Sequence, residues 1–133
     1  MRGWTLGLGV AAAALACGPH GDSAAGDLMQ QGRQYTAWLY GSQYEQLWNR
    51  FSPDMRQTFG SAADLARFAG QAVTRLGKER GQIDEKVETE SSTRIYSRTA
   101  SFDRSRHRML LEWAVAEDGA VTGMVLRPAV DGQ

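Results

Sequence analysis

The sequence is poor in the residues that most often form covalent cross-links or metal centres. Among its 133 residues there is one cysteine, Cys17, so the chain cannot form an internal disulfide. The two histidines, His20 and His107, are far apart, and no group of His, Cys and Asp has the spacing of metal ligands. We therefore expect neither a metal site nor a cofactor.

The sequence also lacks an excess of charge of either sign. Lys and Arg together number 15, as do Asp and Glu, which gives a formal net charge of zero. A domain that binds nucleic acid through its phosphates carries a clear basic excess, so we do not expect nucleic acid as a partner. No glycine-rich phosphate loop and no nucleophile elbow is present, and we predict no catalytic residue.

The longest apolar run, residues 5–15, has about eleven residues and is too short to span a membrane, which needs roughly twenty. It follows a short basic start that contains Arg2, and it ends in small residues directly before Cys17. This arrangement is typical of a cleavable export signal. We predict a signal peptide over residues 1–16 and a mature chain that begins at Cys17.

The segment Ala14-Leu15-Ala16-Cys17 resembles the lipobox of bacterial lipoproteins. The resemblance implies lipidation of Cys17, with a diacylglycerol on its sulfur and, after cleavage, an acyl chain on its amine. One alternative stays open: Ala14-x-Ala16 also fits ordinary signal cleavage, and lipoboxes favour leucine where Ala14 stands. By the same resemblance, Gly18 after the cysteine implies sorting to the periplasmic face of the outer membrane.

Small and polar residues fill positions 17–26, which we predict to be a flexible tether behind the lipidated cysteine. The rest of the chain changes from a helical apolar period to alternation after Gly81. The predicted helices cover residues 27–40, 42–51, 53–59 and 61–76, and the predicted strands cover residues 82–90, 93–102, 107–116 and 120–127. Ser52 and Ser61 are expected to cap helices. The buried face of the last helix is expected to contain Leu65, Phe68, Ala69, Ala72, Val73 and Leu76.

The dipeptide Asp118-Gly119 predicts a two-residue turn between the last two strands, with Glu117 opposite Ala120. The cross-strand pairs that follow from this alternation are Trp113 with Met124, Leu111 with Leu126, and Tyr96 with Trp113. One face of the sheet is then apolar and needs a cover. We predict an α+β domain in which N-terminal helices pack on a curved four-stranded antiparallel sheet.

The segment 41–56, GSQYEQLWNRFSPDMR, resembles the helical start of NTF2-like (cystatin-like cone) domains. It is most similar to a group of uncharacterised bacterial envelope domains that often precede serine hydrolase or β-lactamase-like domains. The segment 119–128, GAVTGMVLRP, fits the terminal hairpin of that group, so the resemblance covers residues 28–128. It implies an NTF2-like cone over residues 27–129, followed by a tail over 130–133.

A cone of this kind can hold a ligand between its helices and its concave sheet. The side chains expected to line such a pocket are Tyr44, Trp48, Tyr96, Arg98 and Trp113. Arg98 stands out because the alternation places it on the apolar face, where a guanidinium needs a carboxylate or an anionic ligand. Glu45 or Asp54 from the helices could supply that carboxylate. The alternatives are that the aromatic residues form the core and that Arg98 reaches solvent or pairs within the protein.

The remaining charged residues are expected to face solvent. Asp84, Glu85, Glu88 and Glu90 are expected along a solvated edge, and His107 at a hairpin tip. We predict a lipid-anchored accessory or binding module of the cell envelope, without catalytic activity, that could act with a separate hydrolase. Two alternatives remain. One is a small pocket enzyme of the same fold, isomerase- or hydrolase-like. The other is a scaffold that self-associates through the outer sheet face, at Ser97, Thr99, Leu110 and Ala114.

Overall fold

The computed structural model describes residues 20–130, with the side chains of residues 26–130. The predicted signal peptide, Cys17 and the last three residues of the predicted tail lie outside the described residues. The elements within them are α1 (His20–Tyr40), α2 (Tyr44–Trp48), α3 (Pro53–Phe59), α4 (Ala62–Leu76), β1 (Glu79–Glu90), β2 (Thr93–Phe102), β3 (Met109–Val115) and β4 (Val121–Pro128). The helices precede a four-stranded antiparallel sheet of order β1-β2-β3-β4, which confirms the predicted α+β class.

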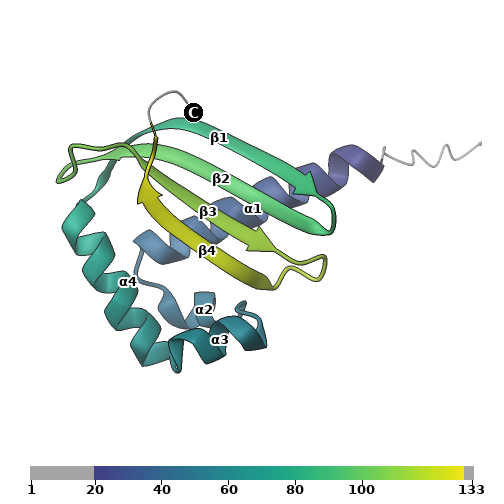
Figure 1. Ribbon diagram of the computed structural model, residues 1–133, viewed down its shortest axis with the longest axis horizontal. Coiled ribbons are helices and arrows are strands. Elements are labelled where there is room, and N and C mark those ends of the chain that lie inside the picture. The colour runs from purple at the N-terminus through teal and green to yellow at the C-terminus, as the bar shows by residue number, and fades with distance from the viewer. Residues whose placement is uncertain (1–19, 131–133) are drawn as a thin grey trace, which may run out of the picture.

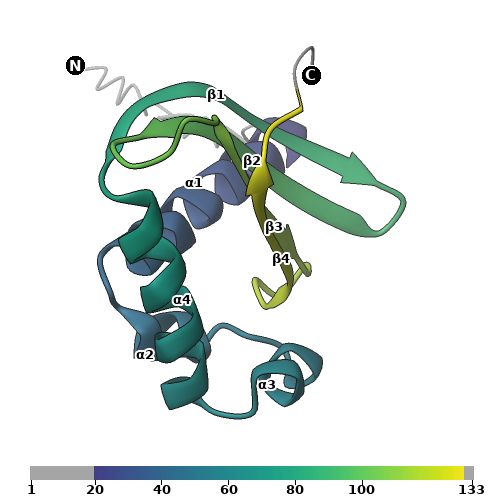
Figure 2. The ribbon, with the colours of Figure 1, turned by 60° about the vertical axis from the view of Figure 1, so that its left-hand side comes forward.

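The helices and the sheet form two layers. In Figure 1 helix α1 crosses behind the sheet, and α2, α3 and α4 gather below it. Figure 2 shows that the sheet is curved, with the long β1–β2 hairpin arching over α1. The start of α1 lies at the end of the sheet that carries the β1–β2 turn, whereas the β2–β3 loop lies at the opposite end (Figure 1).

Helices α1 and α2 have bounds that differ from the prediction. Helix α1 begins at His20 rather than Asp27, so much of the segment predicted to be a flexible tether is helical. No proline follows residue 19 before the end of this helix, and Ala24-Ala25 favours helix. Helix α2 is shorter than predicted, because Ser42 takes a positive φ of 61° and Phe51 leaves the helix to bridge Val121 of β4.

The helix caps agree with the prediction. The Ser52 hydroxyl accepts a hydrogen bond from the Met55 amide at 3.3 Å, and Pro53 follows at the first helical position. The Ser61 hydroxyl accepts one from the Asp64 amide at 3.1 Å. Burial of Phe68 on α4 was predicted wrongly: its side chain is 58% exposed and leans against Phe59 at the surface, 5.7 Å between ring centroids.

The strand register is confirmed for the central pairs, which are Tyr96 with Trp113, Trp113 with Met124, and Leu111 with Leu126. The predicted pairing of Glu117 with Ala120 is wrong. A bulge between Ala114 and Val115 shifts the ladder, so that the Ala116 amide donates to the Ala120 carbonyl at 2.8 Å. Gly119, with a φ of 90°, ends a three-residue turn of the kind that carries a glycine bulge.

The core lies between the helices and the inner face of the sheet. Trp113 has no exposed surface, and its ring packs edge-on against Tyr35 with 6.0 Å between centroids. Its Nε1 donates to the Thr36 hydroxyl at 3.0 Å, and that hydroxyl donates to the Gly32 carbonyl at 2.7 Å. The other fully buried large side chains include Tyr96, Leu28, Leu39, Leu47, Leu65, Leu111, Val115 and Val121.

Candidate functional site

Two irregularities in β1 create the main polar site. The ladder between β1 and β2 shifts between Glu79 and Gly81 and again between Gln82 and Asp84. Glu79, Gln82 and Glu85 are three residues apart, yet they pair with Phe102, Ala100 and Arg98, which share one face of β2. In a regular strand that spacing would alternate between faces. The bulges thus bring three polar side chains of β1 to the inner face beside Arg98.

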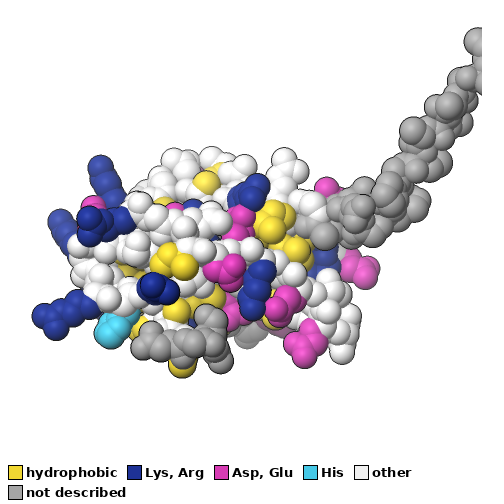
Figure 3. Space-filling view, turned by 90° about the horizontal axis from the view of Figure 1, so that it is seen from above, with side chains coloured by type: hydrophobic (Ala, Val, Ile, Leu, Met, Phe, Trp, Pro, Cys, Tyr) yellow, Lys and Arg dark blue, Asp and Glu magenta, His cyan; other side chains and the backbone are white. Residues whose placement is uncertain are grey.

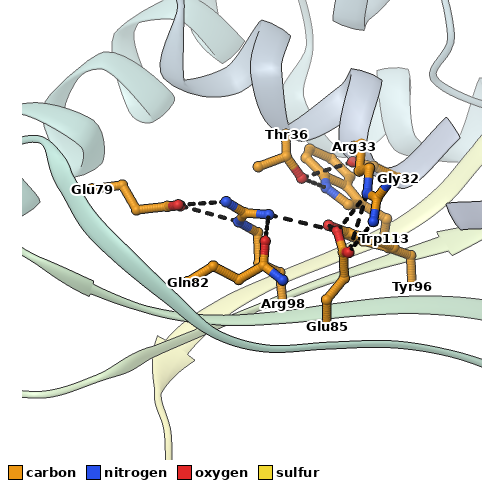
Figure 4. Close-up of polar contacts among 9 residues, drawn as sticks. All are labelled: Gly32, Arg33, Thr36, Glu79, Gln82, Glu85, Tyr96, Arg98 and Trp113. Carbon is orange, nitrogen blue, oxygen red and sulfur yellow. Dashed lines mark hydrogen bonds and ion pairs between the residues drawn. The ribbon is translucent and has the colours of Figure 1, made fainter. Parts of the chain in front are cut away.

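Glu85 is the centre of this group, which we call the Glu85 cluster (Arg33, Glu79, Gln82, Glu85, Tyr96 and Arg98). Its side chain is only 6% exposed. Arg33 of α1 donates to it from Nη2 at 2.6 Å and from Nε at 3.0 Å, and the Tyr96 hydroxyl donates to Oε2. Figure 4 shows Arg33 and Tyr96 converging on this carboxylate from opposite layers. The cluster therefore ties α1 to the sheet.

Arg98 lies between two carboxylates of β1. Its Nε donates to Glu79 Oε2 at 3.1 Å, and its Nη2 donates to Glu79 Oε1. Its Nη1 donates to Gln82 Oε1 at 2.6 Å and lies 3.6 Å from Glu85 Oε2. The Arg98 side chain is 17% exposed, and its guanidinium is paired within the protein.

The ionisation of the cluster follows from these contacts. The hydrogen bonds from Arg33, helped by Tyr96 and opposed by burial, lower the pKa of Glu85 from 4.5 to about 2. Burial and the hydrogen bond to Glu85 raise the pKa of Tyr96 to about 12. The hydrogen bonds from Arg98 to Glu79 raise the pKa of Arg98, although burial of the guanidinium lowers it. At neutral pH the cluster is a network of charged Arg and Glu around a neutral phenol, and Glu85 is a poor proton acceptor.

The five side chains predicted to line a pocket are not brought together. Tyr96 and Trp113 have no exposed surface, so they belong to the core and cannot wall an open cavity. Tyr44 and Trp48 lie on α2, where the guanidinium of Arg56 sits 5.7 Å from the centre of the Trp48 ring. Arg98 does have carboxylate partners, but they come from β1 and not from Glu45 or Asp54 as predicted.

The sequence reasoning missed the four cluster members other than Tyr96 and Arg98. Glu85 was expected on a solvated edge, because plain alternation along residues 82–90 does not reveal the bulges of β1. Arg33 was missed because a single arginine in a predicted helix is expected to face solvent, and its side chain is in fact 61% exposed. A spacing of three among polar residues of a strand was the available signal.

An open groove of about 590 Å³ lies between α4 and the start of β1. Its walls include Tyr40, Val73, Thr74, Lys78, Glu79 and Arg104, and we call it the Tyr40 groove. Burial, aided by the nearby Glu79 carboxylate, raises the pKa of Tyr40, so its hydroxyl stays protonated. Glu79 also binds Arg98, so the groove lies next to the Glu85 cluster. Glu85 itself is not among the residues that line the groove.

Basic side chains surround this groove. We call the set the basic end, and it consists of Arg75, Lys78, Arg80, Arg104, Arg106 and Arg108, all exposed. Figure 3 shows Lys and Arg at the end of the molecule that carries the β2–β3 loop, and Asp and Glu toward the other end. Asp103 binds Arg80 at 3.3 Å and Glu79 binds Arg98, so both acids near the groove are already paired.

The described residues show neither a candidate metal site nor a candidate membrane-spanning helix. No three His, Cys, Asp or Glu side chains within residues 26–130 could hold a metal ion together. Among the helices that the structure describes, none has both the length and the apolar character of a membrane span.

No protein-family model matches the chain, and neither a curated protein nor a solved structure matches it significantly.

Proposed function

We propose that the chain is an exported, lipid-anchored binding module of the cell envelope, held through Cys17 at the periplasmic face of the outer membrane. The leader supports the export step, because a short basic start, an apolar run and small residues directly precede the cysteine. A single cysteine has no partner for an internal disulfide, which favours acylation as its role. Several acyl chains would make the attachment effectively permanent.

We assign the folded part to the NTF2-like cones. Three features support this assignment: helices that precede the sheet, a sheet that curves around α1, and a terminal hairpin closed by Gly119. Folds of this kind carry many functions, so the assignment itself names none. The function has to be argued from the surfaces of this chain.

The Tyr40 groove is the observation that carries the binding function. It is open, it has an aromatic and aliphatic wall at Tyr40 and Val73, and cations border it. An accessible groove with a few polar groups is the usual form of a binding site. The basic end has six cations, and of these Arg80 alone has a carboxylate partner among the described residues. This excess of positive charge suits an acidic surface on an envelope partner, such as a separate hydrolase.

The length and direction of α1 fit this arrangement. With 21 residues the helix is about 30 Å long. The start of this helix is the described part of the chain nearest to Cys17 in sequence. The β2–β3 loop, which carries Arg104 and Arg106 of the basic end, lies at the opposite end of the domain (Figure 1). An anchor at Cys17 would therefore leave the Tyr40 groove directed away from the membrane.

A pocket enzyme is the weaker candidate. It would need an accessible carboxylate as base beside a donor such as Tyr96. Glu85 does face Tyr96, but its two arginine partners stabilise its ionised form, and its side chain is 6% exposed. A binding role agrees better with this closed, paired network.

Cys17→Ser is expected to lower the membrane-bound fraction at least roughly tenfold, because serine offers no thiol for the diacylglycerol. The precursor is also expected to keep residues 1–16. Fractionation of cells that express the full chain measures both effects, with Ser23→Ala in the same region as the control. Normal processing and continued membrane partition of Cys17→Ser would refute the anchor.

A further inference from the structure

A second groove runs along one face of α1, away from the basic end. Its volume is about 280 Å³. The walls used in the argument below are Asp27, Gln30, Gln31, Gln34, Trp38 and Arg50, of which all but Arg50 come from α1. The α1 positions recur at spacings of three and four, which places them on one side of the helix. We call this the Trp38 groove.

The polar groups of the Trp38 groove have few partners within the protein. Asp27, Gln30, Gln34 and Arg50 are exposed, and their side chains make no hydrogen bond or ion pair within residues 26–130. Oε1 of Gln31 is buried and has no donor among the described residues. A buried acceptor without a donor is unusual, because its desolvation costs free energy that a partner would offset. The groove therefore offers several amide groups to an external ligand.

The aromatic wall of the groove is held in place. The Trp38 indole is partly exposed, and it packs against Tyr35 with 5.8 Å between ring centroids and 37° between planes. Tyr35 is buried, and its hydroxyl donates to the Gly119 carbonyl of the β3–β4 turn. Because both the helix and the turn support this ring pair, Trp38 can serve as a rigid flat surface.

The chemistry of these walls selects among ligand classes. An anion would be better served by an excess of cations, but Asp27 balances Arg50 here. A purely apolar ligand would leave three glutamine side chains without partners. A pyranose ring suits both features: its hydroxyl groups are donors and acceptors, as amides are, and its C–H face packs on an indole. The volume is close to the roughly 300 Å³ at the lower end of small-molecule sites.

We propose that the Trp38 groove binds one pyranose unit of an envelope glycan. Trp38 stacks on the sugar ring, while the exposed amides of Gln30 and Gln34 bond its hydroxyl or acetamido groups. Asp27 and Arg50 close the two sides. This site is separate from the Tyr40 groove and adds a ligand class to the proposed function.

The test uses the full chain, solubilised in detergent, titrated with the tetrasaccharide of N-acetylglucosamine and followed by saturation-transfer NMR. We expect saturable binding that weakens at least tenfold in Gln34→Ala and is lost in Trp38→Ala. Gln71→Ala is the matched control, because Gln71 is an exposed amide on α4, outside this groove. Gln34 is exposed and without a partner, so its replacement leaves the fold intact even where Trp38→Ala loosens it.

Three results would overturn the proposal: no saturation by the tetrasaccharide, equal loss of binding in Gln34→Ala and Gln71→Ala, or tighter binding of adenosine than of the sugar. The last result would assign the groove to nucleobases, which also stack on indole rings. Because the titration needs no membrane, its failure is distinguishable from failure of the Cys17 anchor.

Discussion

Gly32→Ala is expected to lower the free energy of unfolding by roughly 3 kcal/mol or more, at the upper end of overpacking effects. A Cβ at this position would lie 2.1 Å from Cγ of Tyr96 and 2.5 Å or less from both of its Cδ atoms. Tyr96 has no exposed surface into which it could turn. The helix would have to move away from the sheet, which would also strain the hydrogen bonds from Trp113 to Thr36 and from Thr36 to Gly32.

Gly26→Ala in the same helix is the control. No atom lies within 4 Å of a Cβ built there, so alanine is expected to stabilise the helix by about 0.5–1 kcal/mol. Urea unfolding followed by tryptophan fluorescence measures both variants. If Gly32→Ala does not lower the free energy of unfolding below that of Gly26→Ala, then α1 does not pack on β2 at Tyr96 as described.

Glu85→Gln is expected to remove much of the acid-sensitive stability of the domain. The pKa of Glu85 is lowered from 4.5 to about 2, and a carboxyl whose pKa is lower in the folded state stabilises that state when it is ionised. A shift of this size corresponds to about 3 kcal/mol. The contribution is complete above pH 4.5 and is lost as the pH falls through the folded value near 2.

The wild-type protein should therefore exceed Glu85→Gln in stability at neutral pH, and the two curves should converge toward pH 2. Glu88→Gln is the matched control, because Glu88 is an exposed glutamate of the same strand, 3.2 Å from Lys86. Its stability curve should follow that of the wild type within about 0.5 kcal/mol. Parallel curves for the wild type and Glu85→Gln from pH 7 to 2 would contradict the assigned ionisation of the cluster.

Local signals predicted most of the architecture. Ser52 and Ser61 stand directly before the helices that they cap, so a short segment is sufficient to place each helix start. The alternation of Met109, Leu111, Trp113 and Val115 fixed which face of β3 is buried, and the pairs with β2 and β4 followed. These features need no knowledge of the rest of the chain.

The errors occurred where distant contacts decide the local structure. Phe51 has the spacing of a helix residue, but the backbone around it bonds to β4: the Val121 amide donates to the Arg50 carbonyl at 2.7 Å. The bulges in β1 interrupt the plain alternation from which the strand was predicted, and so Glu85 was expected on a solvated edge. Arg98 was expected to need a carboxylate or an anionic ligand, because a guanidinium on an apolar face is costly without one. Its actual partners depend on those bulges.

Mass spectrometry of the N-terminal peptide, from protein extracted out of the membrane fraction, tests the proposed anchor most directly. We expect a peptide that begins at Cys17, with a diacylglycerol on its sulfur and an acyl chain on its amine. A peptide that begins at Met1, or one that begins at Cys17 and carries no lipid, would contradict the proposal that this domain is a lipid-anchored module.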